Sequence, residues 1–165
     1  MTAVEPTSVV PVTREQAEVL LTAPETFLQR FGLTLVPGYL AFPEALPHTL
    51  QALKNGADPA WSSHLIVAGR EVVGFGGFTG PPRDDAVEIG YSVAPARQGR
   101  GHATAAIRAW VQGARRAGVG RVVAHTLPGE NPSVRVLRRV GFRRDGEATD
   151  ADVGTVWRWI LPLPN

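Results

Sequence analysis

The stretch Tyr91–Trp110, "YSVAPARQGRGHATAAIRAW", changes from the polarity pattern of a strand to that of a helix. Residues 86–93 alternate in polarity as a half-buried strand does, whereas from His102 onward apolar residues recur at helical spacing. Between the two lies a short turn that contains Gly99 and Gly101. The order strand, turn, helix is the first part of a β-α-β crossover, so it predicts a further strand parallel to residues 86–93.

The turn also has the features of an anion-binding site. A helix that begins near His102 leaves its first backbone N–H groups without intrahelical partners and carries partial positive charge at that end. Glycine permits positive φ and has no Cβ to hold a ligand off the backbone. Such a turn accepts a pyrophosphate well, although a plain corner between packed elements explains two glycines equally well. The dinucleotide fingerprint and the P-loop are excluded, because Thr104 replaces the third glycine and the region has no lysine.

The flanking sequence predicts one α/β (α+β) domain over residues 1–165, with a mixed central sheet of about six to seven strands flanked by helices. Thr13 with Gln16, and Thr22 with Glu25, have the spacing of capping boxes. We expect helices at 14–21, 24–31, 47–54, 102–117 and 132–140, and strands at 7–13, 63–68, 72–79, 86–93, 121–127 and 153–161, with 142–147 as a partner of the last strand.

The composition excludes several kinds of site. The chain has no cysteine, and its four histidines lack the spacing of zinc ligands, so we expect no disulfide and no metal. No apolar run is long enough to span a bilayer and no signal peptide opens the chain, so we expect a cytoplasmic protein without membrane contact. Five arginines between residues 135 and 144 suit a solvated surface or a phosphate-bearing small ligand. No nucleic-acid-binding motif accompanies them.

In its order of residues, the turn resembles the acyl-CoA-binding segment of the GNAT N-acetyltransferase superfamily, whose pattern is Gln/Arg-x-x-Gly-x-Gly/Ala. Gln98, Gly101 and Ala103 occupy the three defining positions. The later stretch "NPSVRVLRRVGF", residues 131–142, is similar to the second signature of that superfamily, which ends in Gly-Phe. The nearer similarity is to the RimJ/RimL type, the ribosomal-protein N-terminal acetyltransferases. The resemblance covers about residues 62–145.

The resemblance implies acetyl-CoA as cosubstrate, bound in a cleft where strand 86–93 diverges from strand 121–127. Val93 would contact the pantetheine arm through its backbone, and Asn131 would reach the arm from the other side. Asn131 lies one residue nearer Gly141 than the pattern has it, with Glu130 at the usual place. The pyrophosphate would lie on the backbone N–H groups of Gln98, Gly99, Arg100, Gly101, His102, Ala103 and Thr104.

The implied reaction is acetyl transfer to a primary amine, of a protein N-terminus or a small molecule, by direct attack on the thioester. Deprotonation at pH 7 costs about 4.6 kcal/mol for a lysine amine with a pKa near 10.4 and about 1.4 kcal/mol for an α-amine with a pKa near 8. A general base is therefore useful, and Glu88 is the candidate. It shares a strand face with Gly90 and Ser92, and related enzymes carry a catalytic glutamate on this strand. The alternative for Glu88 is an exposed strand face or a salt bridge to an arginine.

The general acid is harder to assign. Many members of the superfamily have a tyrosine four residues before the Gly-Phe pair, where this chain has Leu137. In the RimJ/RimL type the candidate lies eight residues before the glycine, which is Ser133; its alternative role is that of a helix-start residue after Asn131. Without catalysis, the chain would be an acyl-CoA-binding or regulatory module. We expect segment 24–61 to shape the acceptor pocket, with Phe31, Tyr39, Phe42 and Trp61 as an apolar wall and His64 nearby. The expected oligomeric state is a monomer or a homodimer.

Overall fold

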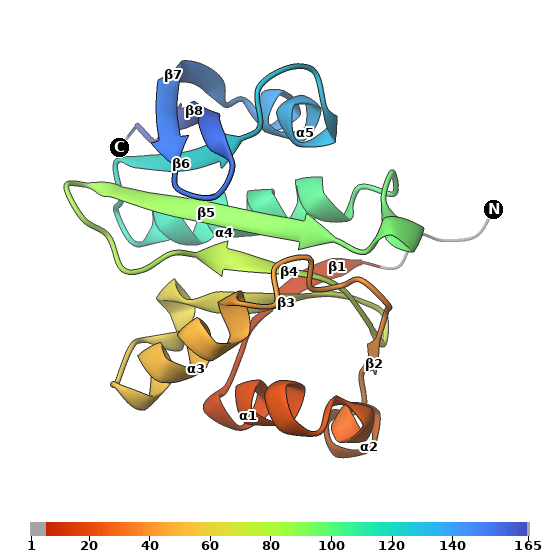
Figure 1. Cartoon of the computed structure of the whole chain (residues 1–165). Helices are drawn as coiled ribbons and strands as arrows, with labels where there is room; N and C mark the ends of the chain where they lie inside the picture. The colour runs from red at the N-terminus through yellow and green to blue at the C-terminus, as the bar shows by residue number, and fades with distance from the viewer. Residues whose placement is uncertain (1–5, 165) are drawn as a thin grey trace.

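The computed structural model describes residues 6–164, which form a mixed sheet flanked by helices (Figure 1). The sheet has eight strands in the order β1-β3-β4-β5-β6-β8-β7, and β2 pairs with β4 beside this path. The strands are β1 Thr7–Pro11, β2 Thr34–Leu35, β3 Ser63–Ala68, β4 Glu71–Phe78, β5 Ala86–Val93, β6 Arg121–Thr126, β7 Arg143–Asp150 and β8 Gly154–Pro162. The α-helices are α1 Arg14–Thr22, α2 Phe27–Phe31, α3 Ala45–Lys54, α4 His102–Arg116 and α5 Pro132–Val140, and the 3-10 helices are η1 Pro24–Thr26, η2 Pro59–Trp61 and η3 Pro95–Arg97.

The parallel pair that the sequence predicts, β5 and β6, is confirmed, and it is short. The two strands pair only from Ala86 with Arg121 to Ile89 with Ala124. Beyond Ile89, β5 continues to Val93 paired with β4 alone, while β6 continues to Thr126 paired with β8. The two strands therefore separate in the middle of the sheet, as Figure 1 shows, and this fork is the predicted divergence.

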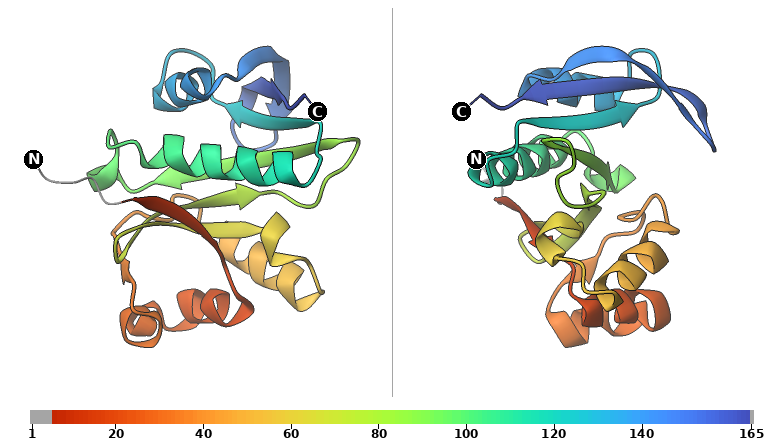
Figure 2. Two further views of the ribbon diagram at one scale, coloured as in Figure 1. Left: turned by 180° about the vertical axis from the view of Figure 1, so that it is seen from behind. Right: turned by 90° about the vertical axis from the view of Figure 1, so that its left-hand side faces the viewer.

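Helices cover both faces of the sheet, so the central strands are buried on both sides. On β3, Ile66 packs into the cluster beneath α4, which includes Trp110, whereas Leu65 and Val67 face the cluster formed with α1–α3, which includes Phe27. Figure 2 shows α4 on one side of the sheet and α1–α3 on the other. The alternation on β3 follows from the two-residue period of a strand.

The observed starts of the helices agree only partly with those predicted from the sequence. The capping box is present at Thr13, whose Oγ1 accepts from the Gln16 N–H at 3.0 Å. The predicted box of Thr22 with Glu25 is wrong: Ala23 precedes η1, and no side chain of the described residues caps that helix. The expected loop 33–46 contains β2 and the start of α3, two residues earlier than predicted. Pro47 is tolerated there because first-turn N–H groups lack intrahelical partners.

Candidate functional site

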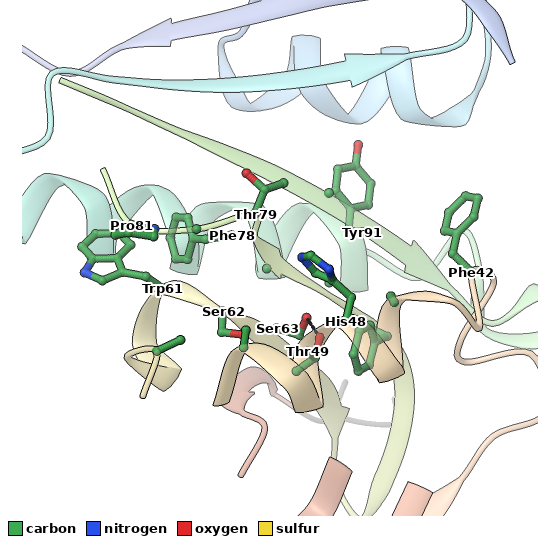
Figure 3. Close-up of a pocket in the computed structure, with 18 of the residues that line it drawn as sticks. Phe42, His48, Thr49, Trp61, Ser62, Ser63, Phe78, Thr79, Pro81 and Tyr91 are labelled. Atoms are coloured by element: carbon green, nitrogen blue, oxygen red, sulfur yellow. Dashed lines mark hydrogen bonds between the residues drawn. The ribbon is translucent and has the colours of Figure 1, made fainter. Parts of the chain in front are cut away.

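Two cavities meet at the fork. The first, here called the cradle cavity, has a volume of about 620 Å³ and lies between the end of β5, the turn into α4 and α5. The second, the α3 cavity, has about 520 Å³ and lies between β4, β5 and α3 (Figure 3). Phe42, Tyr91 and Ser92 line both. The two cavities therefore adjoin at these three residues.

The cradle cavity contains most of the predicted site. The predicted residues that line it are Val93, Gln98, Gly99, Gly101, His102, Ala103, Thr104 and Ser133. Gly99 and Gly101 have φ of 76° and 86°, and a Cβ built on either would meet nothing within 4 Å. Among the described residues, no backbone N–H from Gly99 to Thr104 donates a hydrogen bond. The turn thus offers a row of free donors at the positive end of α4, which suits a pyrophosphate.

Side chains fix the turn from behind. The Gln98 amide donates to the Val93 carbonyl at 3.0 Å, and Arg97 forms a bidentate pair with Glu71 at 3.1 and 2.8 Å. The hydrogen bond from Arg97 lowers the pKa of Glu71. The His102 ring is buried, with Nδ1 2.8 Å from the Thr7 hydroxyl, so it points into the protein. Burial, with Arg100 and Arg97 nearby, lowers the pKa of His102. Any contact of His102 with a phosphate would therefore come from its backbone N–H and not from its ring.

Three predicted residues lie outside both cavity walls. Arg100 is one. Asn131 caps α5, where its Oδ1 accepts from the Val134 N–H at 3.0 Å and its Nδ2 donates to the carbonyls of Leu127 and Gly129. Its amide is thus used within the loop before α5, in line with its displaced position in the sequence. Arg139 of α5, by contrast, lines the cradle cavity. The arginine cluster was the only sequence signal for it.

The third predicted residue outside both cavity walls is Glu88, which lies on the paired part of β5, beside the fork. Its Oε1 is 2.5 Å from Nδ1 of His125 on β6, so its partner is a histidine and not an arginine, and its side chain is 41% exposed. His125 was missed, but parallel pairing of Glu88 with Val123 places His125 on the same face. The next residue on that face, Gly90, lines the α3 cavity, and a Cβ there would meet nothing within 4 Å. Open space over Gly90 therefore leads from the carboxylate toward the cavity.

Ser133 and Tyr91 meet at the junction of the cavities. Ser133 lies in the first turn of α5, and Tyr91 lies on β5 beyond its last pair with β6. Burial raises the pKa of Tyr91 to about 12, and the nearby Ser133 hydroxyl, as a weak hydrogen-bonding neighbour outside normal geometry, lowers it by less. The Tyr91 hydroxyl has no hydrogen-bond partner among the described residues. Sequence reasoning missed Tyr91, because its place at the fork depends on where β5 and β6 stop pairing.

The α3 cavity is mainly apolar. Trp61 packs edge-on against Phe78 with ring centroids 4.9 Å apart, and both line the cavity, as does the exposed Phe42 (Figure 3). Phe31 and Tyr39, also expected in the acceptor wall, instead pack into the cluster with α1–α3. The Asp58 carboxylate, the one acidic group among the lining residues, accepts from the Ala60 N–H at 2.9 Å. This cavity suits an acceptor with little charge.

His64, which sequence reasoning placed near the acceptor, lies behind the wall of the α3 cavity. Its buried ring hydrogen-bonds to the Ser62 carbonyl at 3.0 Å, and burial lowers its pKa. Between residues 6 and 164, no group of three histidine, aspartate or glutamate side chains could hold a metal ion. None of the helices in that range is long and apolar enough to cross a membrane.

A family model described as an acetyltransferase (GNAT) domain matches residues 9–143. Among solved structures, the ribosomal-protein-S5-alanine acetyltransferase of Vibrio fischeri superposes with a TM-score of 0.69 at 18% identity, covering 99% of this chain and 97% of that one. RimJ of Mycobacterium smegmatis, in complex with CoA-disulfide, gives 0.67 at 21% identity over 96% and 84%. The microcin C7 self-immunity acetyltransferase MccE, in complex with acetyl-CoA and AMP, gives 0.67 at 18% over 94% and 92%. No curated protein sequence matches the chain significantly.

Proposed function

The chain belongs to the GNAT acetyltransferase family, and we propose that it moves the acetyl group of acetyl-CoA to the α-amine of a peptide or protein N-terminus. The observation that carries this proposal is the meeting of two cavities at the fork between β5 and β6. One cavity has the donors for a pyrophosphate, and the other is an apolar pocket that ends at the same three residues. The fork would bring thioester and amine together.

The cradle cavity fits acetyl-CoA by the chemistry of its wall. The free N–H groups from Gly99 to Thr104 would receive the pyrophosphate, and Arg139 adds a cation to the same cavity. The pantetheine arm would run along Gly90–Val93 of β5, which have no partner on β6. The amides of the pantetheine arm could hydrogen-bond to the main chain of this segment as a neighbouring strand would.

The acceptor is inferred from the small number of charges in the α3 cavity. A protonated amine that enters it loses water, and the lining residues offer it one carboxylate, that of Asp58, which already caps η2. The amine must therefore lose its proton easily, and deprotonation at pH 7 costs an α-amine about 3 kcal/mol less than a lysine amine. The S5-alanine acetyltransferase and RimL, a ribosomal L7/L12 α-N-protein acetyltransferase, are named for protein acceptors, which supports the same class here.

The proton would leave through the Glu88–His125 pair. Glu88 faces the α3 cavity across Gly90, so a water molecule between amine and carboxylate could carry the proton. Ser133 lines the cradle cavity near Tyr91 and is the candidate to relay a proton to the departing CoA thiolate.

The test is an acceptor screen with acetyl-CoA. Peptides with a free N-terminus and no lysine are compared with the same peptides N-terminally blocked and carrying one lysine, with CoA release and product mass as readouts. We expect acetylation of the free N-termini with at least tenfold higher kcat/KM than of lysine. Preference for lysine would overturn the acceptor class. Binding of acetyl-CoA without transfer to any amine would identify a binding module instead.

A further inference from the structure

Tyr91 occupies a special position on β5. It lies two residues beyond Ile89, the last residue of β5 that pairs with β6, so its side chain borders the fork. It lines both cavities. Figure 3 shows its hydroxyl directed away from α3 and toward the α5 side of the fork. An amine and a thioester that meet between the cavities would do so beside this side chain.

The Tyr91 hydroxyl is buried near Ser133 but makes no hydrogen bond of normal length and angle in the described part of the chain. In the described part of the chain, only two buried side-chain polar atoms lack a hydrogen bond, the Tyr91 hydroxyl and Nε1 of Trp110. Trp110 belongs to the core beneath α4 and lines neither cavity. A buried donor without a partner costs free energy, so native proteins leave few of them. The one that borders the cavities is explained if a ligand completes its hydrogen bond.

We propose that the Tyr91 hydroxyl donates a hydrogen bond to the sulfur of the acetyl-CoA thioester and stabilises the negative charge that develops on it during transfer. The inference rests on the proposed function. The amine nitrogen forms a bond to the carbonyl carbon and gives up a proton to the base. The carbon–sulfur bond then breaks, and its electron pair leaves on sulfur. Tyr91 keeps its own proton throughout.

The role is hydrogen-bond donation, not proton transfer, because of the environment of the phenol. Burial holds the pKa of Tyr91 at about 12, whereas a free cysteine thiol has a pKa near 8.5, so a thiolate is too weak a base to remove the proton. A donor that is already oriented and shielded from water needs little reorganisation as charge develops, which makes such donors effective in catalysis. The Trp110 ring, 6.5 Å away between centroids, helps to hold the Tyr91 ring in place.

The first experiment is Tyr91→Phe, which removes only the hydroxyl. We expect kcat for an acetylated acceptor to fall between tenfold and a hundredfold, while the dissociation constant of acetyl-CoA, from calorimetry, and the Tm change little. Tyr39→Phe is the matched control. Tyr39 is the other of the two tyrosines, and burial also raises its pKa to about 12, but it lines neither cavity. We expect its kcat to stay within twofold of wild type.

The second experiment separates donation from packing. Fluorotyrosines placed at position 91 keep the ring and hydroxyl but lower the phenol pKa stepwise, which strengthens the donor. We expect kcat to vary steadily with phenol pKa, whereas a packing role predicts no such trend. A wild-type level of kcat in Tyr91→Phe, or no trend among the fluorotyrosines, overturns the inference while the function stands. A wild-type protein that binds acetyl-CoA but acetylates nothing overturns both.

Discussion

The cradle cavity and the α3 cavity lie side by side but are built in different ways. The cradle is mainly backbone: a row of N–H groups from one turn, shaped by Gly99 and Gly101. The α3 cavity is mainly side chains, contributed by α3, the segment before it, η2 and the adjoining strands β4 and β5. A backbone site depends on where glycine stands, whereas a side-chain site can change its shape with any lining residue. Substitutions in the two cavities should therefore act differently, and under the proposed function they should separate binding of acetyl-CoA from binding of the acceptor.

The largest effect expected is on the cradle. Gly101→Val places a branched side chain in the cavity, so the pyrophosphate should lose one or two hydrogen bonds worth about 1.5–3 kcal/mol each. We expect the dissociation constant of acetyl-CoA to rise about a hundredfold, measured by calorimetry. Gly118→Val is the control, because Gly118 has a similar φ of 77° and open space but lies beyond the far end of α4. Equal loss of binding in both variants would show that strain, and not the cradle, is responsible.

Glu88→Gln should act on turnover and leave the cradle intact. We expect kcat to fall at least tenfold with little change in acetyl-CoA affinity, because the amide cannot accept a proton from the amine. Steady-state kinetics and calorimetry on one preparation measure both quantities. Glu130→Gln is the matched control, since Glu130 pairs with Arg138 at 2.5 Å on the surface. If Glu88→Gln retained full turnover, its pair with His125 would be structural only.

Filling the α3 cavity should affect only the acceptor. Ala52 on α3 lines this cavity alone, so Ala52→Phe takes up space that the acceptor needs. We expect KM for the peptide to rise about five- to tenfold, which corresponds to about 1–1.4 kcal/mol, with KM for acetyl-CoA unchanged. The neighbouring Gln51→Phe lies on the exposed face of the same helix and serves as control. A rise in both KM values in Ala52→Phe would mean that the two cavities do not act separately.

The smallest effect concerns the pH dependence of stability. His102 lines the cradle cavity, and His64 is buried behind the wall of the α3 cavity. Burial lowers the pKa of both His64 and His102, so below the ordinary pKa of about 6.5 the unfolded chain binds more protons than the native one. The free energy of unfolding should therefore decrease as pH falls below about 6.5, by at most about 1.4 kcal/mol per pH unit for each histidine. Urea unfolding between pH 5 and pH 8 measures this slope. His64→Gln and His102→Gln should each make it shallower, and an unchanged slope in both would contradict the assignment.

The same contrast explains what could be predicted from the sequence. The strands 63–68 and 86–93, the helix 132–140 and the parallel pair β5–β6 follow from local polarity and one crossover, and the structure confirms them. Of the predicted site residues, those in the contiguous turn, apart from Arg100, meet in one cavity. The Glu88–His125 pair and the position of Tyr91 depend on the register of the strands and on where they part, which no local pattern specifies. Asn131 was expected at the ligand from the family resemblance, whereas the structure shows its side chain capping α5.

The fork also means that the protein keeps an open sheet edge in its interior. Exposed edges of this kind attract further strands and lead to aggregation. Here Gly90–Val93 form such an edge, but α5 packs against α4 beside it, and Gln98 already occupies the Val93 carbonyl. A polypeptide strand could enter only by displacing α5, whereas a thin, unbranched chain with two amides needs far less room. A feature that would be an aggregation hazard on the surface is thereby restricted to small ligands.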